Sequence, residues 1–216
     1  MTDAAADEAR LRESMVRWGR SLFERGFTVG SSGNMSARIA GGYLFTPTNS
    51  CLGFLEPERL SRLDASGRHI GGDAPTKELP LHMAFYESRP AAMAVVHLHS
   101  TFSTALSCLA DADPEDAIPP ITPYVVMRVG RVPILPYTKP GSPDVAPLVR
   151  ARAAQHPAML LANHGPVVAG TSLESAVFAI EELEETAKLV LLTRGMAIRH
   201  LDAAQIAALE SSFKLR

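Results

Sequence analysis

The chain has 216 residues, of which 46% are hydrophobic and 20% are charged, a composition typical of a folded globular protein rather than a disordered one. Its formal net charge is -2 and its pI is near 6.4, so we expect no binding to nucleic acid. The length suits a single domain over 1–216 with a substantial buried core.

The sequence carries no signal for export or membrane insertion. Its apolar runs fall short of the ~20 residues that a membrane span needs, and the acidic start Met1–Glu8 does not resemble a signal peptide. Cys51 and Cys108 lack a CxxC spacing, so we expect two buried, unpaired thiols. We therefore expect a cytoplasmic protein with no membrane partner.

The first half of the chain predicts two helices around a hairpin. Apolar residues recur at the three- and four-residue spacing of an amphipathic helix at Leu11, Met15, Trp18 and Leu22. The glycine-containing segment 40–42 separates two strand-like segments, which is a hairpin signal. The expected elements are a helix over 4–25, strands over 35–39 and 43–46, and a helix over 79–88.

The second half interleaves short strands and helices without a regular βαβ rhythm, which predicts an α/β domain with a mixed sheet. Thr171 and Glu174 form a candidate capping box before a long helix, whose acidic residues 181–185 are expected to face solvent. We expect strands over 94–99, 125–127, 132–135 and 159–170, the last interrupted at 164–166. We expect helices over 100–106, from Ser142 and Pro143 onward, over 172–194 and over 202–212.

His97 and His99 stand two residues apart in an apolar run, so in a strand their imidazoles project from one face. His164 ends another apolar run, and Gly165 after it would let the backbone pass close to a bound group. A close pair of histidines with a distant third is a typical catalytic zinc constellation, since three ligands leave one position open. We predict such a site, with zinc preferred and Mn2+ or Co2+ as alternatives. The other histidines are expected to be ordinary side chains: His69, His82, His156 and His200.

Glu78 is the carboxylate that we place near this metal. It begins a helix beside Thr76 and Lys77, where it can act as a fourth metal ligand, as a general acid/base, or as both in turn. A first-turn glutamate that favours the helix dipole is the simpler interpretation. The glycine-rich segment 30–36 can likewise bind an anion or simply form a turn, and it has neither the Walker nor the Rossmann spacing.

Five motifs, in order along nearly the whole chain, resemble the class II aldolase/adducin family, which includes fuculose-phosphate aldolase and ribulose-phosphate epimerase. They are Gly33-Asn34-Met35-Ser36, Thr46-Pro47-Thr48, Thr76-Lys77-Glu78, Val96-His97-Leu98-His99 and Asn163-His164-Gly165. The resemblance implies a three-layer α/β/α domain with a central mixed, mostly antiparallel sheet. It also implies a homotetramer with active sites at the subunit interfaces.

The resemblance also implies roles for particular residues. The implied zinc ligands are His97, His99 and His164. Glu78 matches the acid/base, which also ligates the resting metal. Tyr124 is the candidate for a catalytic tyrosine that reaches the site from a neighbouring subunit, with Tyr137 as its competitor. The residues implied to bind the phosphate of a sugar phosphate are Asn34, Thr48, Asn49, Thr76 and Lys77.

Two departures separate the chain from the aldolases, which usually have glycine in place of Asn49 and Ser-Ser in place of Thr76-Lys77. A lysine ammonium adds a full positive charge, which can bind a phosphate or neutralise a substrate carboxylate. The stretches that look most like the 3-oxo-tetronate 4-phosphate decarboxylases are 73–78, 96–109, 121–130 and 161–170.

This second resemblance implies a divalent-metal-dependent carboxy-lyase. A metal that polarises the ketone of a 3-oxo acid lets carbon dioxide leave, and protonation of the metal-stabilised enediolate yields dihydroxyacetone phosphate. One alternative is an aldolase or epimerase for a ketose phosphate such as fuculose 1-phosphate or ribulose 5-phosphate. Two others are a zinc hydrolase or hydratase and a non-catalytic adducin-like module.

Overall fold

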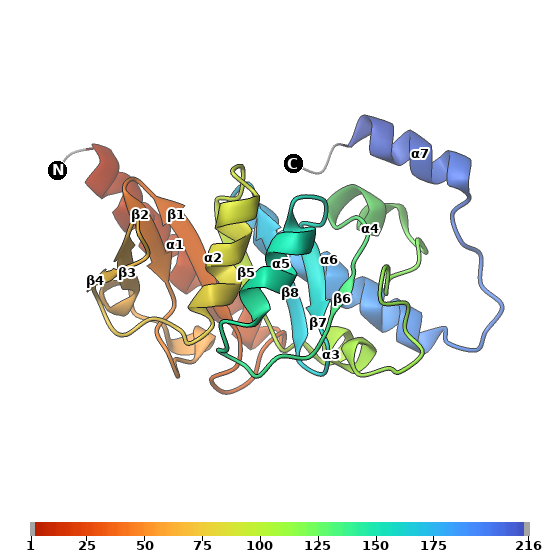
Figure 1. Cartoon of the computed structure of the whole chain (residues 1–216), viewed down its shortest axis with the longest axis horizontal. Coiled ribbons are helices and arrows are strands. Elements are labelled where there is room, and N and C mark those ends of the chain that lie inside the picture. The colour runs from red at the N-terminus through yellow and green to blue at the C-terminus, as the bar shows by residue number, and fades with distance from the viewer. Residues whose placement is uncertain (1–2, 214–216) are drawn as a thin grey trace.

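The computed structural model describes residues 3–213, and its central strands are buried on both faces (Figure 1). In β5 (Ala94–His97), Ala94 and Val96 belong to one apolar core and Val95 belongs to another. The same alternation divides the neighbouring strands, because successive side chains of a strand leave from opposite faces. A sheet with two apolar faces needs helices on both of them.

Eight strands form one sheet in the order β4-β3-β2-β1-β5-β8-β7-β6. Neighbouring strands are antiparallel except for β6 and β7, which are parallel. The predicted mixed, mostly antiparallel sheet is therefore confirmed. Besides β5, the strands are β1 (Asn34–Ile39), β2 (Gly42–Phe45), β3 (Ser61–Asp64), β4 (His69–Gly71), β6 (Ile134–Leu135), β7 (Ala158–Leu161) and β8 (Gly165–Gly170).

Helices cover both faces of the sheet and complete the predicted three layers (Figure 1). One face carries α2 (Leu79–Ser88) and α5 (Val145–Ala153), which pack against each other. The other face carries α1 (Asp3–Glu24), α3 (Thr101–Ser107), α4 (Pro123–Arg128) and α6 (Leu173–Leu192). The last helix, α7 (Ala203–Ser212), follows a long connection and packs on α4. Two short 3-10 helices, Leu52–Phe54 and Pro57–Arg59, contact α1.

The predicted strand over 125–127 is wrong, because these residues lie in α4. Thr122 caps this helix by accepting a hydrogen bond from the Val125 backbone N–H, and Pro123 occupies the first helical position. These start signals outweigh the strand preference of two adjacent valines. The predicted strand over 132–135 is shortened to β6, which pairs with β7.

Two helix starts also differ from the predicted ones. The capping box of α6 consists of Ser172 and Ser175 rather than Thr171 and Glu174. Ser172 has the extended backbone that a capping residue needs, with φ of -155° and ψ of 165°. The helix expected from Ser142–Pro143 begins after that pair, as α5. Local sequence signals therefore located both helices to within a few residues.

The predicted strand over 159–170 is instead the antiparallel hairpin of β7 and β8. Asn163 lies in the turn with φ of 56°, a left-handed conformation that asparagine tolerates, and His164 follows it. A Cβ added to Gly165 would lie only 2.4 Å from the Leu98 carbonyl oxygen. The sequence led us to expect that Gly165 lets the backbone pass close to a bound group. In the structure it lets the hairpin approach the end of β5.

The acidic cluster of α6 does not face solvent throughout. Glu184 is buried, and its carboxylate accepts hydrogen bonds from the Ser100 hydroxyl and from the backbone N–H groups of Phe102 and Ser103. These N–H groups belong to the first turn of α3 and have no partner within the helix. Glu184 is therefore an internal cap for α3, which corrects its predicted role as a solvated side chain.

Two further findings concern the chain as a whole. Between residues 3 and 213, no helix combines the length and the apolar character of a membrane span. Both cysteines are free, as expected. Cys51 is half-buried and Cys108 is exposed, so the prediction that both thiols are buried is wrong. Cys108 is exposed because it lies at the C-terminal cap of α3.

Candidate active site

Three imidazoles meet where the end of β5 lies beside the turn between β7 and β8. His97 is the last residue of β5, and the buried Leu98 separates it from His99. The Nε2 atoms lie 3.1 Å apart in His97 and His99, 3.0 Å apart in His99 and His164, and 3.3 Å apart in His97 and His164. His97 and His99 at the end of β5 and His164 in the hairpin turn together form one histidine cluster.

The rings are oriented as neutral ligands. His97 Nδ1 lies 2.8 Å from the Pro166 carbonyl oxygen and donates to it, so His97 Nε2 carries no proton. Burial lowers the pKa of His97 and His99, and it lowers the pKa of His164 to about 4. The lone pairs of three neutral nitrogens this close together repel one another, and a shared cation would stabilise them. Three converging imidazole nitrogens are the donor arrangement of a metal site.

The Glu78 carboxylate approaches the histidine cluster from the start of α2. Its Oε2 atom lies 3.3 Å from His97 Nε2, and its Oε1 atom lies 3.6 Å from His164 Nε2. The side chain makes no hydrogen bond that caps α2, so capping does not explain its direction. Burial alone would raise the pKa of the Glu78 carboxyl, but the hydrogen bond from the Asn34 amide favours the ionised form, and that pKa lies below its ordinary value.

These three imidazoles and one carboxylate offer four ligand atoms within 4.8 Å of one another. Nitrogen and oxygen donors in this number suit a catalytic divalent metal, with one ligand that water or substrate can replace. Glu78 is the one carboxylate of the set and comes from a separate element, the start of α2. Imidazole-rich sets accept zinc and several other transition metals.

A cavity of about 160 Å³ opens beside the cluster. Its lining includes Glu78, His99 and His164. It also includes every residue that the sequence resemblance assigns to phosphate binding, namely Asn34, Thr48, Asn49, Thr76 and Lys77. Lys77 is exposed, and it is the only lysine or arginine among the described residues that line this cavity. The structure thus brings the predicted metal and substrate residues into one site.

Backbone hydrogen bonds join the loops that form this cavity. The Thr48 N–H donates to the Ala74 carbonyl oxygen at 2.9 Å, and the Thr76 N–H donates to the Thr46 carbonyl oxygen at 3.1 Å. The Thr76 hydroxyl accepts from the Glu78 N–H at 3.2 Å. The hydroxyl-rich loops and Glu78 therefore share one wall of the cavity.

Part of the lining was not predicted from the sequence. Pro140 and Gly141 line the cavity. They lie in the loop between β6 and α5, far in sequence from the histidine strand. Gly141 has φ of 80°, and a Cβ added to it would lie 3.1 Å from the Lys77 Cβ atom. The predicted site did not include this pair. Its closeness to Lys77 arises from the tertiary structure alone.

His82 is also more than the ordinary side chain that we predicted. It is fully buried in α2, with Nε2 2.5 Å from Asn34 Oδ1 and Nδ1 2.7 Å from Ser36 Oγ. Burial lowers the pKa of His82 to about 3, so the ring is neutral. Asn34 in turn donates from Nδ2 to Glu78 Oε2 at 2.8 Å. The available signal was spacing, since His82 follows Glu78 by four residues on the same helical face.

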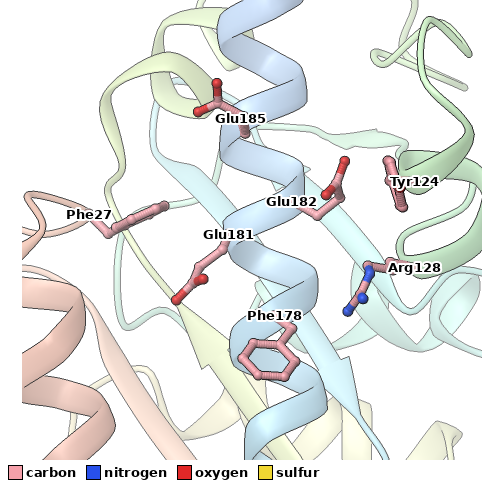
Figure 2. Close-up of a pocket in the computed structure, with 7 residues that line it drawn as sticks. All are labelled: Phe27, Tyr124, Arg128, Phe178, Glu181, Glu182 and Glu185. Atoms are coloured by element: carbon pink, nitrogen blue, oxygen red, sulfur yellow. The ribbon is translucent and has the colours of Figure 1, made fainter.

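Tyr124 does not line the active-site cavity of its own chain. It projects from α4, is 55% exposed and lines a separate groove of about 500 Å³. Figure 2 shows Tyr124 and Arg128 on one side of α6, Phe27 on the other side, and glutamates of α6 between them. Tyr137 is likewise exposed and is absent from the described lining of the active-site cavity.

The fold and the site define a class of protein. An α/β/α sandwich presents three histidines and a glutamate beside loops rich in hydroxyl groups. A family model described as the Class II Aldolase and Adducin N-terminal domain matches residues 13–191. The chain belongs to this family, as its motifs predicted.

Individual relatives narrow the comparison further. The 3-oxo-tetronate 4-phosphate decarboxylase of Escherichia coli strain K12 is 51% identical over 98% of this chain and 100% of its own. The L-fuculose phosphate aldolase of Haemophilus influenzae is 32% identical over 96% of this chain and 95% of its own. A crystal structure of YgbL from Escherichia coli has a TM-score of 0.91 and 51% identity, covering 94% of this chain and 98% of that one.

Proposed function

We propose that this chain is a metal-dependent carboxy-lyase that converts a 3-oxo-tetronate 4-phosphate to carbon dioxide and dihydroxyacetone phosphate. The observation that carries the proposal is that the chain has a higher sequence identity to decarboxylases than to aldolases of the same family. Five decarboxylases of that name are 46–51% identical over at least 94% of this chain. Three sugar-phosphate aldolases are only 31–34% identical.

The charge of the cavity supports this choice of substrate. A 3-oxo-tetronate 4-phosphate carries both a phosphate and a carboxylate, whereas a ketose phosphate carries only the phosphate. Thr48, Asn49 and Thr76 offer neutral hydrogen-bonding groups for the phosphate, and Lys77 adds a full positive charge beside them. Asn34 also faces the cavity and holds the Glu78 carboxylate. The additional cation matches the additional anionic group of the acid.

The histidine cluster and Glu78 supply the proposed chemistry. His97, His99 and His164 would hold a divalent metal, which would supply Lewis-acid polarisation of the ketone of the 3-oxo acid. Glu78 occupies the cluster in the free enzyme and moves away when substrate binds. Once it has left the cluster, the Glu78 carboxyl can carry a proton to the carbon that carbon dioxide leaves. Tyr124 is the second candidate for delivering that proton.

We also propose a homotetramer with a zinc ion at each active site. Tyr124 supports shared sites, since an exposed hydroxyl outside its own cavity can act only in the site of another chain. The three imidazoles and one carboxylate support zinc, with Mn2+ or Co2+ as alternatives. A single domain over 1–216 and a cytoplasmic location belong to the same proposal, and the free cysteines support the latter.

The decisive experiment is a paired product assay. Purified zinc-loaded protein receives a 3-oxo-tetronate 4-phosphate, and carbon dioxide and dihydroxyacetone phosphate are measured in the same reaction. We expect the two products in equal amounts, loss of both after chelation, and their return when zinc is restored. Metal analysis should find about one divalent ion per chain.

Fuculose 1-phosphate is the comparison substrate, because the relative that is 32% identical makes an aldolase the second candidate. Triose phosphate released from this ketose phosphate, with no carbon dioxide formed from the oxo acid, would identify an aldolase and contradict the decarboxylase. Turnover that is unaffected by complete metal removal would contradict both reactions as written here.

A further inference from the structure

Five polar side chains alternate across the interface between α2 and β1. Glu78, His82 and Tyr86 recur every four residues on one side of α2, and Asn34 and Ser36 stand two apart on β1. Successive contacts measure 2.8 Å for Glu78–Asn34, 2.5 Å for Asn34–His82, 2.7 Å for His82–Ser36 and 2.8 Å for Ser36–Tyr86. The two periodicities produce an unbroken hydrogen-bonded chain, here called the α2–β1 relay, behind the histidine cluster.

The α2–β1 relay is shielded from water except at its Glu78 end, which lines the cavity. Asn34, Ser36, His82 and Tyr86 are all buried, and His82 and Ser36 have no exposed surface. Buried polar groups are costly unless each finds a hydrogen-bond partner, so every member depends on its neighbours in the relay. The relay therefore has little freedom to rearrange without leaving a donor or an acceptor unpaired.

The direction of each hydrogen bond follows from the Glu78 end. An ionised carboxylate only accepts, so the Asn34 Nδ2 group must donate to it and Asn34 Oδ1 must point to His82. The neutral His82 ring then carries its proton on Nε2, and its Nδ1 accepts from the Ser36 hydroxyl. Ser36 has no second proton, so the Tyr86 hydroxyl donates to it. One arrangement satisfies the whole relay.

We propose that His82 is a positioning residue for Glu78 and acts through the Asn34 amide. The His82 Nε2–H group fixes that amide with Nδ2 toward the carboxylate, and the amide holds Glu78 Oε2 in place. The inference rests on the acid/base role proposed above for Glu78. Within the described structure, His82 belongs neither to the four-residue metal cluster nor to the cavity lining, so it acts at one remove from the chemistry.

Removing the His82 donor changes what the Asn34 amide can do. Asn34 Oδ1 would be buried without a partner, and the amide would lose the contact that sets its orientation. An amide turned the other way presents an oxygen to the Glu78 carboxylate, which repels it. Glu78 then leaves the geometry needed for proton transfer, while the other residues proposed to bind the phosphate stay in place, namely Thr48, Asn49, Thr76 and Lys77. The loss should therefore appear in kcat rather than in KM.

The test compares two substitutions of the same residue in the full-length, zinc-loaded enzyme. His82→Leu removes the donor, and we expect kcat to fall about 10–100-fold with KM changed less than about threefold. His82→Gln can place an amide N–H near the position of Nε2, and we expect it to recover most of the lost kcat. The zinc content of both variants should equal that of the wild type, because the three histidine ligands are untouched.

Two control variants separate positioning from loosened packing. Phe45→Leu disturbs the ring that packs on His82, with centroids 5.4 Å apart, and removes no hydrogen bond. Tyr86→Phe removes the far end of the relay and leaves the Asn34–His82 contact intact. Both should keep kcat within about threefold of the wild type, even if their melting temperatures fall as far as that of His82→Leu. If His82→Leu does not fold, His82→Met replaces it.

A second measurement needs no substrate. In spectra of 15N-histidine-labelled protein, the signals lost in His82→Gln identify His82, and we expect an Nε2-protonated tautomer with unprotonated Nδ1. The opposite tautomer would overturn the inference. So would unchanged kcat in His82→Leu, no recovery in His82→Gln, or an equal loss in Phe45→Leu. A wild-type protein without decarboxylase activity would instead contradict the proposed function, and the tautomer result would still stand.

Discussion

At the scale of single residues, contacts with neighbouring side chains give some residues of the site a different role from the one their sequence position suggests. Glu78 occupies a helix-start position where a glutamate often caps or favours the dipole, yet it makes no cap and lies against His97 and His164 instead. The Asn34 amide holds one of its oxygens. A carboxylate that is both held and replaceable suits a group that serves the metal at rest and the substrate during reaction.

Replacing Glu78 with glutamine tests this dual role. The amide keeps the size of the side chain and can still accept from Asn34, so we expect a melting temperature within a few degrees of the wild type. It cannot transfer the proton, so kcat for decarboxylation should fall about 10²–10⁴-fold. Steady-state kinetics and thermal unfolding measure the two effects. Glu174→Gln, at an exposed position in the first turn of α6 and outside the linings of the cavity and of the Tyr124 groove, is the matched control and should leave kcat unchanged. Undiminished turnover in Glu78→Gln would exclude an acid/base role.

At the scale of elements, the end of β5 is anchored by a helix from the other half of the chain. α3 begins directly after the histidine segment, and its N-cap residue Ser100 makes no side-chain cap of its own. Glu184 of α6 supplies that cap through three hydrogen bonds. The residue that follows His99 is thereby tied to the core, so α6 stabilises both a helix and the position of a metal ligand.

The substitution Glu184→Ala should expose this dependence. It leaves a buried hydroxyl and two backbone N–H groups without their acceptor, which costs about 2–4 kcal/mol of unfolding free energy. For a chain of this size that lowers the melting temperature by about 5–15 °C. Zinc affinity should fall as well, because Ser100 follows His99. Calorimetry and metal titration measure the two effects. Glu185→Ala, one residue further and exposed, should change neither, and equal stability of both variants would contradict the cap.

At the scale of the whole molecule, the proposed site draws on two separate faces of the chain. The cavity, the metal cluster and the phosphate-type loops come from one chain, but Tyr124 faces a groove on α6 instead (Figure 2). A symmetric assembly can bring that face to the cavity of a neighbour. The proposed division of labour between chains can be measured directly.

Mixed oligomers of two inactive variants test whether Tyr124 acts on a neighbour. Glu78→Gln and Tyr124→Phe chains are combined in equal amounts, unfolded together and refolded. If each site takes Glu78 from one chain and Tyr124 from another, about a quarter of the sites recover both groups, so about a quarter of wild-type activity returns. If Tyr124 acts within its own chain, mixing restores nothing, and if Tyr124 is not catalytic, Tyr124→Phe is already active before mixing. Tyr137→Phe in place of Tyr124→Phe tests the competing tyrosine.

The sequence alone determined the local parts of this protein. Periodicity located the long helices and the first hairpin, and the two-residue spacing of His97 and His99 placed them on one face of a strand. Each motif that carried the family resemblance contributes residues to one site. These features follow from neighbours in sequence, because alternation and helical spacing depend only on the local backbone.

Tertiary structure decided what depends on distant partners. Residues 125–127 became helical because the Thr122–Pro123 start signal and packing on α6 outweighed their strand preference. Strands β3 and β4 have no strong pattern of their own, and they add to the edge of the sheet in turn, β3 beside β2 and β4 beside β3. His82 and Glu184 looked like ordinary side chains until β1 and α3 supplied their hydrogen-bond partners. Burial gives such polar groups their roles, and burial is a property of the folded chain.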